Sequence, residues 1–222
     1  METHIVKIIS VEPVTHNVRR FTIEKPEGYK FEPGQATEVS LNTPELKDEA
    51  RPFTFTALNE WSNLEFTIKI YDDHNGVTHA LGEAKPGDEI IVRDVWGAIE
   101  YKGEGVFIAG GAGVTPFIAI IRQLYKDNKI NGNKLIFSNK TSKDIILKDE
   151  FTKMLGDNFI NILTAEKSSD FENGHVDESF LKEKINDFSQ HFYICGPPPM
   201  VKAVTETLTV LGADPEAVVF EK

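Results

Sequence analysis

The 222-residue chain has a single cysteine, Cys195, and no closely spaced pair of histidines. One thiol excludes a disulfide within the chain. It also excludes an iron–sulfur cluster held by this chain alone, because such clusters usually need four thiolates. The six histidines are scattered along the sequence, so the paired-histidine motif of metalloproteases is absent. The composition therefore predicts no metal site.

Long apolar runs are absent too, and none approaches the roughly 20 residues of a membrane-spanning helix. Residues 1–4 lack the charged and apolar start of an export signal. Positive charge is in deficit, since 24 Lys and Arg face 35 Asp and Glu and give a net charge of −11. We therefore expect a cytoplasmic protein whose main partner is neither nucleic acid nor a membrane.

The two parts of the chain differ in pattern. Up to residue 101, short β-branched or aromatic runs alternate with turns such as Pro33-Gly34, which is typical of a small antiparallel β-barrel. After that, apolar strand-like runs alternate with helical segments and indicate a Rossmann-like α/β domain with a parallel sheet. We predict two domains, 1–101 and 102–222. The expected strands are Val18–Ile23, Ala36–Leu41, Pro52–Thr56, Leu64–Ile70, Glu89–Val92, Val106–Ala109, Lys134–Ser138, Asn161–Thr164 and His191–Cys195, and the expected helices are Val77–Glu83, Pro116–Lys126, Lys148–Leu155, Glu178–Ile185 and Met200–Leu211.

Residues 106–117 combine an apolar strand, a glycine-rich turn and a helix start. Glycines let the backbone approach a phosphate, and free N–H groups at the start of a helix point toward it. Pro116 suits the first helical turn, where its missing N–H costs nothing. A plain strand-to-helix connection explains the glycines equally well. The residues of this candidate anion site are Gly111, Gly113, Val114, Thr115 and Pro116.

The spacing Gly-x-Gly-x-x-Pro in this turn resembles the nicotinamide-nucleotide loop of the ferredoxin–NADP reductase family. Residues 193–200, Tyr-Ile-Cys-Gly-Pro-Pro-Pro-Met, resemble the Cys-Gly-Pro-x-x-Met turn of the same family. The resemblance implies that the Cys195 thiol lies beside the nicotinamide and positions the hydride donor. A buried cysteine that ends a strand is the alternative. The implied coenzyme contacts here are Cys195, Gly196, Pro197, Pro198 and Met200.

The N-terminal part resembles the flavin-binding half of that family. Arg51-Pro52-Phe53-Thr54 is similar to its Arg-x-Tyr-Ser/Thr signature. A guanidinium binds the flavin pyrophosphate directionally, an aromatic ring stacks on the flavin, and a hydroxyl donates to the reactive ring nitrogen. Taken alone, Arg51 would be a surface residue of a strand and Phe53 a core residue. The predicted flavin contacts are Arg51, Pro52, Phe53, Thr54, Lys69, Ile70, Gly76, Val77 and Thr78.

Residues 76–78 enter this set because the family has a glycine followed by Ser or Thr at a helix start, where backbone N–H groups bind phosphate. The role of the following His79 stays open, as does that of Phe220, which either covers the flavin or ends the last strand. Thr54 and Cys195 are the predicted catalytic residues.

The coenzyme preference depends on the strand end at residues 162–167. Members of the family that use NADP tend to place Ser and Arg there, whereas this chain has Ala165 and Glu166. A carboxylate at Glu166 would repel a 2′-phosphate, and Lys167 would compensate in part, so the resemblance favours NADH over NADPH. It favours FAD over FMN because no ferredoxin module is fused to the chain.

The resemblance implies an oxidoreductase that passes a hydride from NADH or NADPH to FAD and then electrons to a flavodoxin or ferredoxin. Three alternatives stay open. They are an electron-transfer subunit of an oxygenase or dehydrogenase, a free-flavin or ferric reductase, and a non-redox binding module that has lost its flavin.

Overall fold

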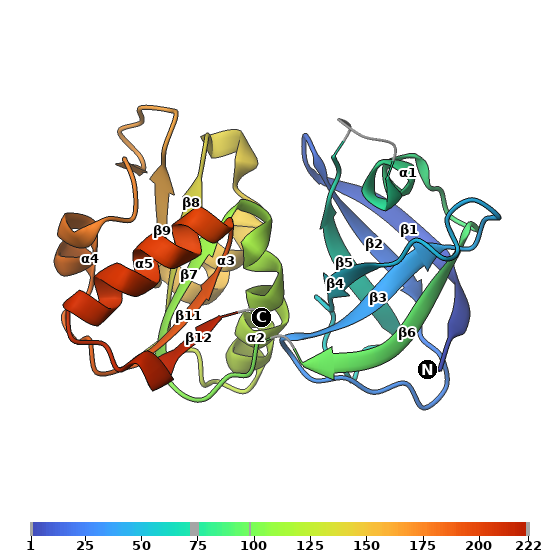
Figure 1. Ribbon diagram of the computed structural model, residues 1–222, viewed down its shortest axis with the longest axis horizontal. Coiled ribbons are helices and arrows are strands. Elements are labelled where there is room, and N and C mark those ends of the chain that lie inside the picture. Colours follow the sequence, from blue (N-terminus) through green and yellow to red (C-terminus); the bar gives the residue numbers. More distant parts are fainter. Residues whose placement is uncertain (1, 72–75, 98, 221–222) are drawn as a thin grey trace. The chain divides into compact units, whose positions relative to one another are not determined.

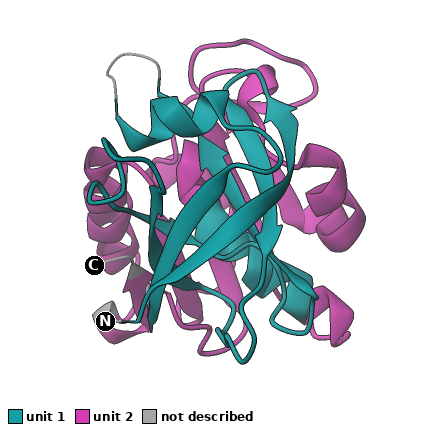
Figure 2. Ribbon diagram, turned by 90° about the vertical axis from the view of Figure 1, so that its right-hand side faces the viewer, with its two compact units in different colours: residues 1–98, 115–123 teal, residues 99–114, 124–222 magenta. Residues whose placement is uncertain are grey.

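The computed structural model describes residues 2–71, 76–97 and 99–220. The chain divides into two compact units, one of residues 1–98 and 115–123, the other of residues 99–114 and 124–222 (Figure 2). Most of helix α2 (Thr115–Lys126) thus groups with the N-terminal residues. The domain ranges 1–101 and 102–222 stay a prediction.

The N-terminal unit is built on a six-stranded antiparallel sheet of order β4-β3-β6-β1-β2-β5 (Figure 1). Its outer strands, β4 and β5, are joined just beyond β4 by a hydrogen bond of 2.9 Å from the Thr56 N–H to the Glu65 carbonyl. The antiparallel fold expected for this part is therefore confirmed, and this bond links the two ends of the strand order. The strands are β1 (His4–Thr15), β2 (Val18–Glu24), β3 (Gln35–Leu41), β4 (Arg51–Thr54), β5 (Asn63–Lys69) and β6 (Glu89–Gly97).

Aromatic side chains fill the core of this unit. Phe55 is fully buried and stacks on Phe31 with ring centroids 4.2 Å apart. The short helix α1 (Val77–Glu83) adds buried Val77 to the same core. A Cβ on Gly82 of this helix would lie 2.8 Å from Ile70, so a glycine is needed for α1 to pack this closely against the chain that follows β5.

The C-terminal unit is built on a six-stranded parallel sheet of order β10-β9-β8-β7-β11-β12. The chain runs from β7 to β8 and β9 on one side and then returns to β11 on the other side of β7 (Figure 1). This parallel α/β fold is also as expected. Its elements are β7 (Gly105–Gly110), β8 (Lys134–Asn139), β9 (Phe159–Leu163), β10 (Glu172–Asn173), β11 (His191–Cys195) and β12 (Val218–Phe220), with helices α3 (Lys148–Leu155), α4 (Glu178–Lys184) and α5 (Pro198–Val210).

One face of this sheet packs on α4 and α5. Ile108 of β7 and Ile194 of β11 share a buried cluster with Leu181 of α4 and Leu208 of α5. Side chains alternate between the faces of a strand, so the residues between them, such as Phe107, belong to the other face. The buried Tyr193 ring stacks on Phe107, with centroids 4.6 Å apart.

The Tyr193 hydroxyl fastens the segment that leads into β7. It donates to the Gly103 carbonyl at 2.8 Å and accepts from the N–H groups of Lys102 and Gly103 at 2.9 and 3.0 Å. Burial raises the pKa of Tyr193, so it stays a neutral phenol near pH 7 and keeps its donor proton. The segment where the sequence pattern changes is therefore hydrogen-bonded to β11.

Several strands differ from expectation. β6 continues to Gly97 instead of ending at Val92, and β12 was not among the expected strands. The sequence prediction placed no strand before Val18, whereas β1 spans His4–Thr15. Its apolar residues point both ways, since Val6 and Ile8 are buried while Ile5 is 60% exposed, and this hides the alternation by which a half-buried strand is found. β9 begins at Phe159, two residues before the predicted start at Asn161, and the two-residue β10 is too short to leave a pattern. No helix among the described residues is long and apolar enough to span a bilayer.

Candidate functional site

The glycine-rich turn and the Cys-Gly-Pro turn lie against each other in the C-terminal unit. A Cβ on Gly113 would lie 2.4 Å from the Cys195 carbonyl oxygen, and one on Gly110 would lie 2.5 Å from the Met200 sulfur. The atoms that face Gly113 belong to the backbone and cannot move aside, so only glycine permits that contact. The two stretches, which are far apart in the sequence, therefore form one continuous surface.

This surface lies at the carboxyl ends of β7 and β11, on either side of the point where the strand order reverses. Cys195 pairs with Ala109 at the end of these strands, and its side chain is buried. Open parallel sheets bind ligands beyond their carboxyl ends at such a reversal. The predicted coenzyme residues of the C-terminal unit, Gly111, Gly113, Val114, Cys195, Gly196, Pro197, Pro198 and Met200, are thus brought together.

Two features of this surface suit a phosphate. Gly111 has φ +53°, and a Cβ there would meet nothing within 4 Å, so its backbone is open to a ligand. Helix α5 begins at Pro198 with no acidic residue in its first turn, so no carboxylate there opposes the positive end of its dipole. Thr115 and Pro116 begin α2 directly after the glycine turn, as expected.

Asn139, which the sequence analysis missed, adds a third feature. It ends β8 beside β7 and is 5% exposed, yet neither its side-chain oxygen nor its nitrogen has a hydrogen-bond partner among the described residues. Buried polar groups are nearly always paired, so this amide fits a ligand that can both donate and accept. With the close glycines, it makes the residues at this sheet edge compatible with a dinucleotide. Its sequence signal was an asparagine at a strand end, where turns also place asparagine.

Glu166 holds a fixed position at the same sheet edge. Its carboxylate accepts from the Ser142 N–H at 2.8 Å and from the Ser142 hydroxyl at 2.9 Å. Ser142 follows β8 and Glu166 follows β9, so the bonds tie two neighbouring strand ends together. The negative charge that the sequence analysis weighed against a 2′-phosphate is therefore held in place by the fold.

The predicted flavin strand, β4, presents a cation and an aromatic ring. The Arg51 side chain is 52% exposed, donates to the Ala50 carbonyl at 2.7 Å and lies 3.8 Å from the Glu49 carboxylate. Phe53 is half-buried, with its ring centroid 6.4 Å from that of Phe66. Thr54 is 6% exposed, and Pro52 is exposed between Arg51 and Phe53. This strand can thus offer a guanidinium, a ring and a hydroxyl to a flavin.

The remaining predicted flavin residues gather at the far end of β5. Gly76 caps α1 in an extended conformation, and the first turn has neither a side-chain cap nor an acidic residue. Val77 is buried and Thr78 half-buried. Ile70 packs against α1 at Gly82, and the Lys69 ammonium lies 5.5 Å from the Tyr71 ring centroid. Ile70 and Val77 belong to the same buried cluster, while the side chain of Phe220 lies outside what the structure describes.

A buried arginine is the second residue that the sequence analysis missed. Arg122 of α2 lies 2.6 Å from the Glu65 carboxylate and donates to the Thr56 carbonyl at 2.7 Å. Its signal in the sequence was a lone charged residue within the apolar run that follows Pro116.

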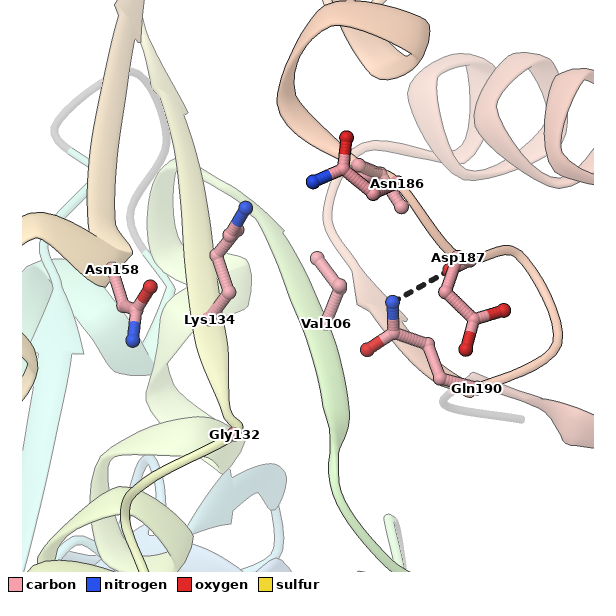
Figure 3. Close-up of a pocket in the computed structure, with 8 residues that line it drawn as sticks. Val106, Gly132, Lys134, Asn158, Asn186, Asp187 and Gln190 are labelled. Atoms are coloured by element: carbon pink, nitrogen blue, oxygen red, sulfur yellow. Dashed lines mark hydrogen bonds between the residues drawn. The ribbon is translucent and has the colours of Figure 1, made fainter.

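A cavity of about 220 Å³ lies away from these residues, at the amino ends of β7 and β8 (Figure 3). Val106 and Lys134 line it, and Gln190 donates to the Asp187 carbonyl at its rim. The Lys134 ammonium donates to the Lys184 carbonyl. Burial, with the Lys184 charge as a smaller cause, lowers the pKa of Lys134. Because the Lys134 ammonium is already bonded to the Lys184 carbonyl, we interpret this cavity as a gap between packed loops.

Two family models match the chain in tandem. The oxidoreductase FAD-binding domain matches residues 5–101, and the oxidoreductase NAD-binding domain matches residues 107–206. The chain belongs to the ferredoxin–NADP reductase-like family. FAD and a nicotinamide dinucleotide are the cofactors that these two domains bind.

Relatives with curated names include two kinds of reductase. NADH-cytochrome b5 reductase 2 of Mycosarcoma maydis is 30% identical over 88% of this chain. The reductase component of propane 2-monooxygenase from Rhodococcus jostii is 27% identical over 97% of this chain. The chain spans 62% of the length of each of these two relatives.

Solved structures share the fold over nearly the whole chain. The FAD/NAD-binding domain of a nitric oxide dioxygenase from Vibrio cholerae superposes with a TM-score of 0.88 at 21% identity, covering 99% of this chain and 98% of that one. A ferredoxin–NADP⁺ reductase from Neisseria gonorrhoeae, solved with FAD and NADP, gives 0.82 at 22% identity, covering 96% of this chain and 92% of that one. At these identities the likeness concerns the fold.

The contact between the two turns predicts the effect of Gly113→Ala. The added methyl group meets backbone atoms of Cys195 and Gly196, which cannot rotate away, so the turns must separate. We expect a loss of roughly 1–3 kcal/mol of unfolding free energy, as for other overpacked sites, and at least tenfold weaker coenzyme binding. Urea unfolding and a coenzyme titration measure the two effects. Gly97→Ala is the control, because a Cβ there meets nothing within 4 Å, and a Gly113→Ala protein as stable as this control would contradict the prediction.

Proposed function

We propose that the chain is an NAD(P)H-dependent flavoprotein reductase that delivers electrons to a separate acceptor protein. The observation that carries the proposal is the packing of Gly113 against the Cys195 carbonyl, because it joins the glycine-rich turn and the Cys-Gly-Pro turn at the sheet reversal. The FAD-binding and NAD-binding family models support the same function. When both are bound, the nicotinamide supplies a hydride and the flavin accepts it.

The N-terminal unit would hold and tune the flavin. Arg51, exposed on β4, would bind the pyrophosphate by charge-assisted hydrogen bonds. The half-buried ring of Phe53 would stack beside the isoalloxazine, and the Thr54 hydroxyl would donate to its reactive nitrogen. Pro52 shapes the strand between them. A second phosphate contact would come from Gly76, Val77 and Thr78 at the start of α1, with Lys69 and Ile70 beside them.

The C-terminal unit would place the coenzyme. The open backbone at Gly111 and the positive end of the α5 dipole suit its phosphates, and Thr115 and Pro116 at the start of α2 adjoin the same turn. The Cys195 thiol would form the small surface on which the nicotinamide is oriented. Asn139 would donate and accept where its amide is now unpaired.

NADH is the coenzyme that we propose. Two hydrogen bonds from Ser142 hold the Glu166 carboxylate at the sheet edge, and Ala165 offers no charge to a 2′-phosphate. Two charges of the same sign in one polar pocket disfavour binding, so NADPH should bind more weakly. Lys167, which is exposed, offsets only part of this repulsion.

The acceptor is proposed to be a small electron-carrier protein, with flavodoxin or ferredoxin as the first candidates. Relatives named as cytochrome b5 reductases add a haem protein of that kind as an alternative. Relatives named as reductase or electron-transfer components of oxygenases favour a second function, that of an electron-transfer subunit in a larger system. A cytoplasmic location stays a prediction from the sequence.

Anaerobic absorbance spectra of the purified protein test the proposed function. We expect a flavin spectrum that bleaches on addition of NADH and bleaches more slowly with NADPH. The same protein, reconstituted with FAD if it is purified without it, serves for both coenzymes. A protein that takes up no FAD would refute the reductase and leave a non-redox binding module.

Arg51→Ala should weaken the binding of FAD. The loss of charge-assisted hydrogen bonds, worth about 1.5–3 kcal/mol, corresponds to roughly a 10- to 100-fold higher dissociation constant. Fluorescence titration of the flavin-free protein measures it. Arg20→Ala is the matched control, because Arg20 lies in the same sheet and pairs with Glu12 at the surface. Equal affinity in the two variants would remove Arg51 from the flavin site.

Cys195→Ser should slow flavin reduction by NADH and leave the flavin content unchanged. A hydroxyl is smaller than the thiol and shifts the surface that orients the nicotinamide, and small misplacements cost on the order of tenfold or more in rate. Rapid anaerobic mixing in a single turnover isolates this step. A reduction rate equal to that of the unaltered protein would exclude Cys195 from the reaction site.

A further inference from the structure

Arg122 makes a buried ion pair within the N-terminal unit, which includes residues 115–123 of helix α2. Its side chain is 7% exposed and that of its partner, Glu65, is 10% exposed, with 2.6 Å between nitrogen and oxygen. The same nitrogen donates to the Thr56 carbonyl at 2.7 Å. The guanidinium also lies over the Trp61 ring, 5.3 Å from its centroid. All of these partners lie on β5 or between β4 and β5. This is where the Thr56–Glu65 backbone hydrogen bond links the two outer strands of the sheet.

Hydroxyl groups extend this network. The Thr56 hydroxyl donates to the Glu65 carboxylate at 2.7 Å, and the Thr67 hydroxyl lies 3.4 Å from that of Thr56. The Glu65 carboxylate is therefore bonded from two directions, by Arg122 of α2 and by Thr56 beyond β4. These bonds form together in only one arrangement of α2, β5 and the chain beyond β4. Moving any of the three would leave a buried charge or donor unpaired.

Stability alone does not explain a buried pair. Removing two charges from water costs several kcal/mol per ion, and replacing such pairs with apolar residues of similar volume is often neutral or stabilising. The planar guanidinium instead supplies directional bonds that an apolar contact lacks. The network is thus better suited to fixing geometry than to holding the fold together.

The geometry that it fixes lies within the N-terminal unit, beside the proposed flavin site. Thr56 continues the strand that carries Thr54, the proposed donor to the flavin. Arg122 stands about two helical turns from Thr115, where α2 begins beside the coenzyme turn. One guanidinium therefore connects the chain that follows β4 with residues 115–123 of α2, which belong to the same unit.

We propose that Arg122 is a positioning residue, whose pair with Glu65 fixes residues 115–123 of α2 relative to β4 and thereby holds the Thr54 hydroxyl in place for the flavin. This inference rests on the proposed function. It differs from that function in naming a pair of residues that touches neither cofactor and yet controls the rate of hydride transfer.

The test compares the double variant Arg122→Met/Glu65→Leu with the unaltered protein. The double variant removes both charges at similar volume, so no buried charge is left unpaired. We expect unchanged or higher thermal stability and unchanged FAD content, but single-turnover flavin reduction at least tenfold slower, with the NADH dissociation constant within about twofold. Hydrogen exchange in the flavin-free protein supplies a readout apart from activity, and the amides of α2 should exchange at least tenfold faster.

Two further variants sharpen the test. Arg122→Lys keeps the charge but not the planar fork and should restore part of the rate. Arg20→Met/Glu12→Leu removes a surface pair of the same unit and should change neither the rate nor the exchange of α2. Reduction at the unaltered rate in the Arg122→Met/Glu65→Leu protein would overturn the inference. Failure of the unaltered protein to take up FAD would overturn the proposed function, and this inference with it, before any variant is compared.

Discussion

The close approach of two backbone turns is the constraint on which the candidate site depends. Gly113 meets the backbone of Cys195 at a distance that no other residue type allows, and Gly110 lies against Met200. The parallel register of β7 and β11 brings the two turns to one edge of the sheet. Sheet topology, glycine sterics and the position of the one cysteine therefore specify a single surface together.

Each of the two units holds a charged side chain in a fixed place. Glu166 is held by Ser142 between two strand ends, and Arg122 is held by Glu65 and Thr56 in the other unit. In a chain with an excess of 11 negative charges, exposed cations such as Arg51 are outnumbered by carboxylates. These placements fit a protein that must bind anionic cofactors despite its overall charge.

Much of this fold could be predicted from the sequence because local patterns determine it. Helices α1 and α3 and strand β11 have the bounds that apolar spacing, glycine and proline predict. β1 was missed because Ile5 and Ile9 are apolar and yet point into solvent. The turns of the candidate site could be predicted because glycine and proline shape them, and the backbone conformations of these residues depend on their own type. Roles for these residues remain predictions that the proposed experiments decide.

Other parts of the site could not be predicted. Arg122 and Glu65 are 57 residues apart, and the residues near each of them in the sequence do not indicate that the two form a pair. Asn139 looked like an ordinary strand end, because the lack of a partner for its amide is a property of its neighbours in space. Both residues depend on which strands become adjacent, and a single sequence carries little of that information.

The chain's only thiol lies inside the surface formed by the two turns. Any reagent that labels sulfur therefore reports on that one place, without the background that other thiols would add. Because Cys195 is buried, the labelling rate follows how often the turns open, and occupancy by a coenzyme should slow it. The fold thus contains its own reporter group for motion at the site.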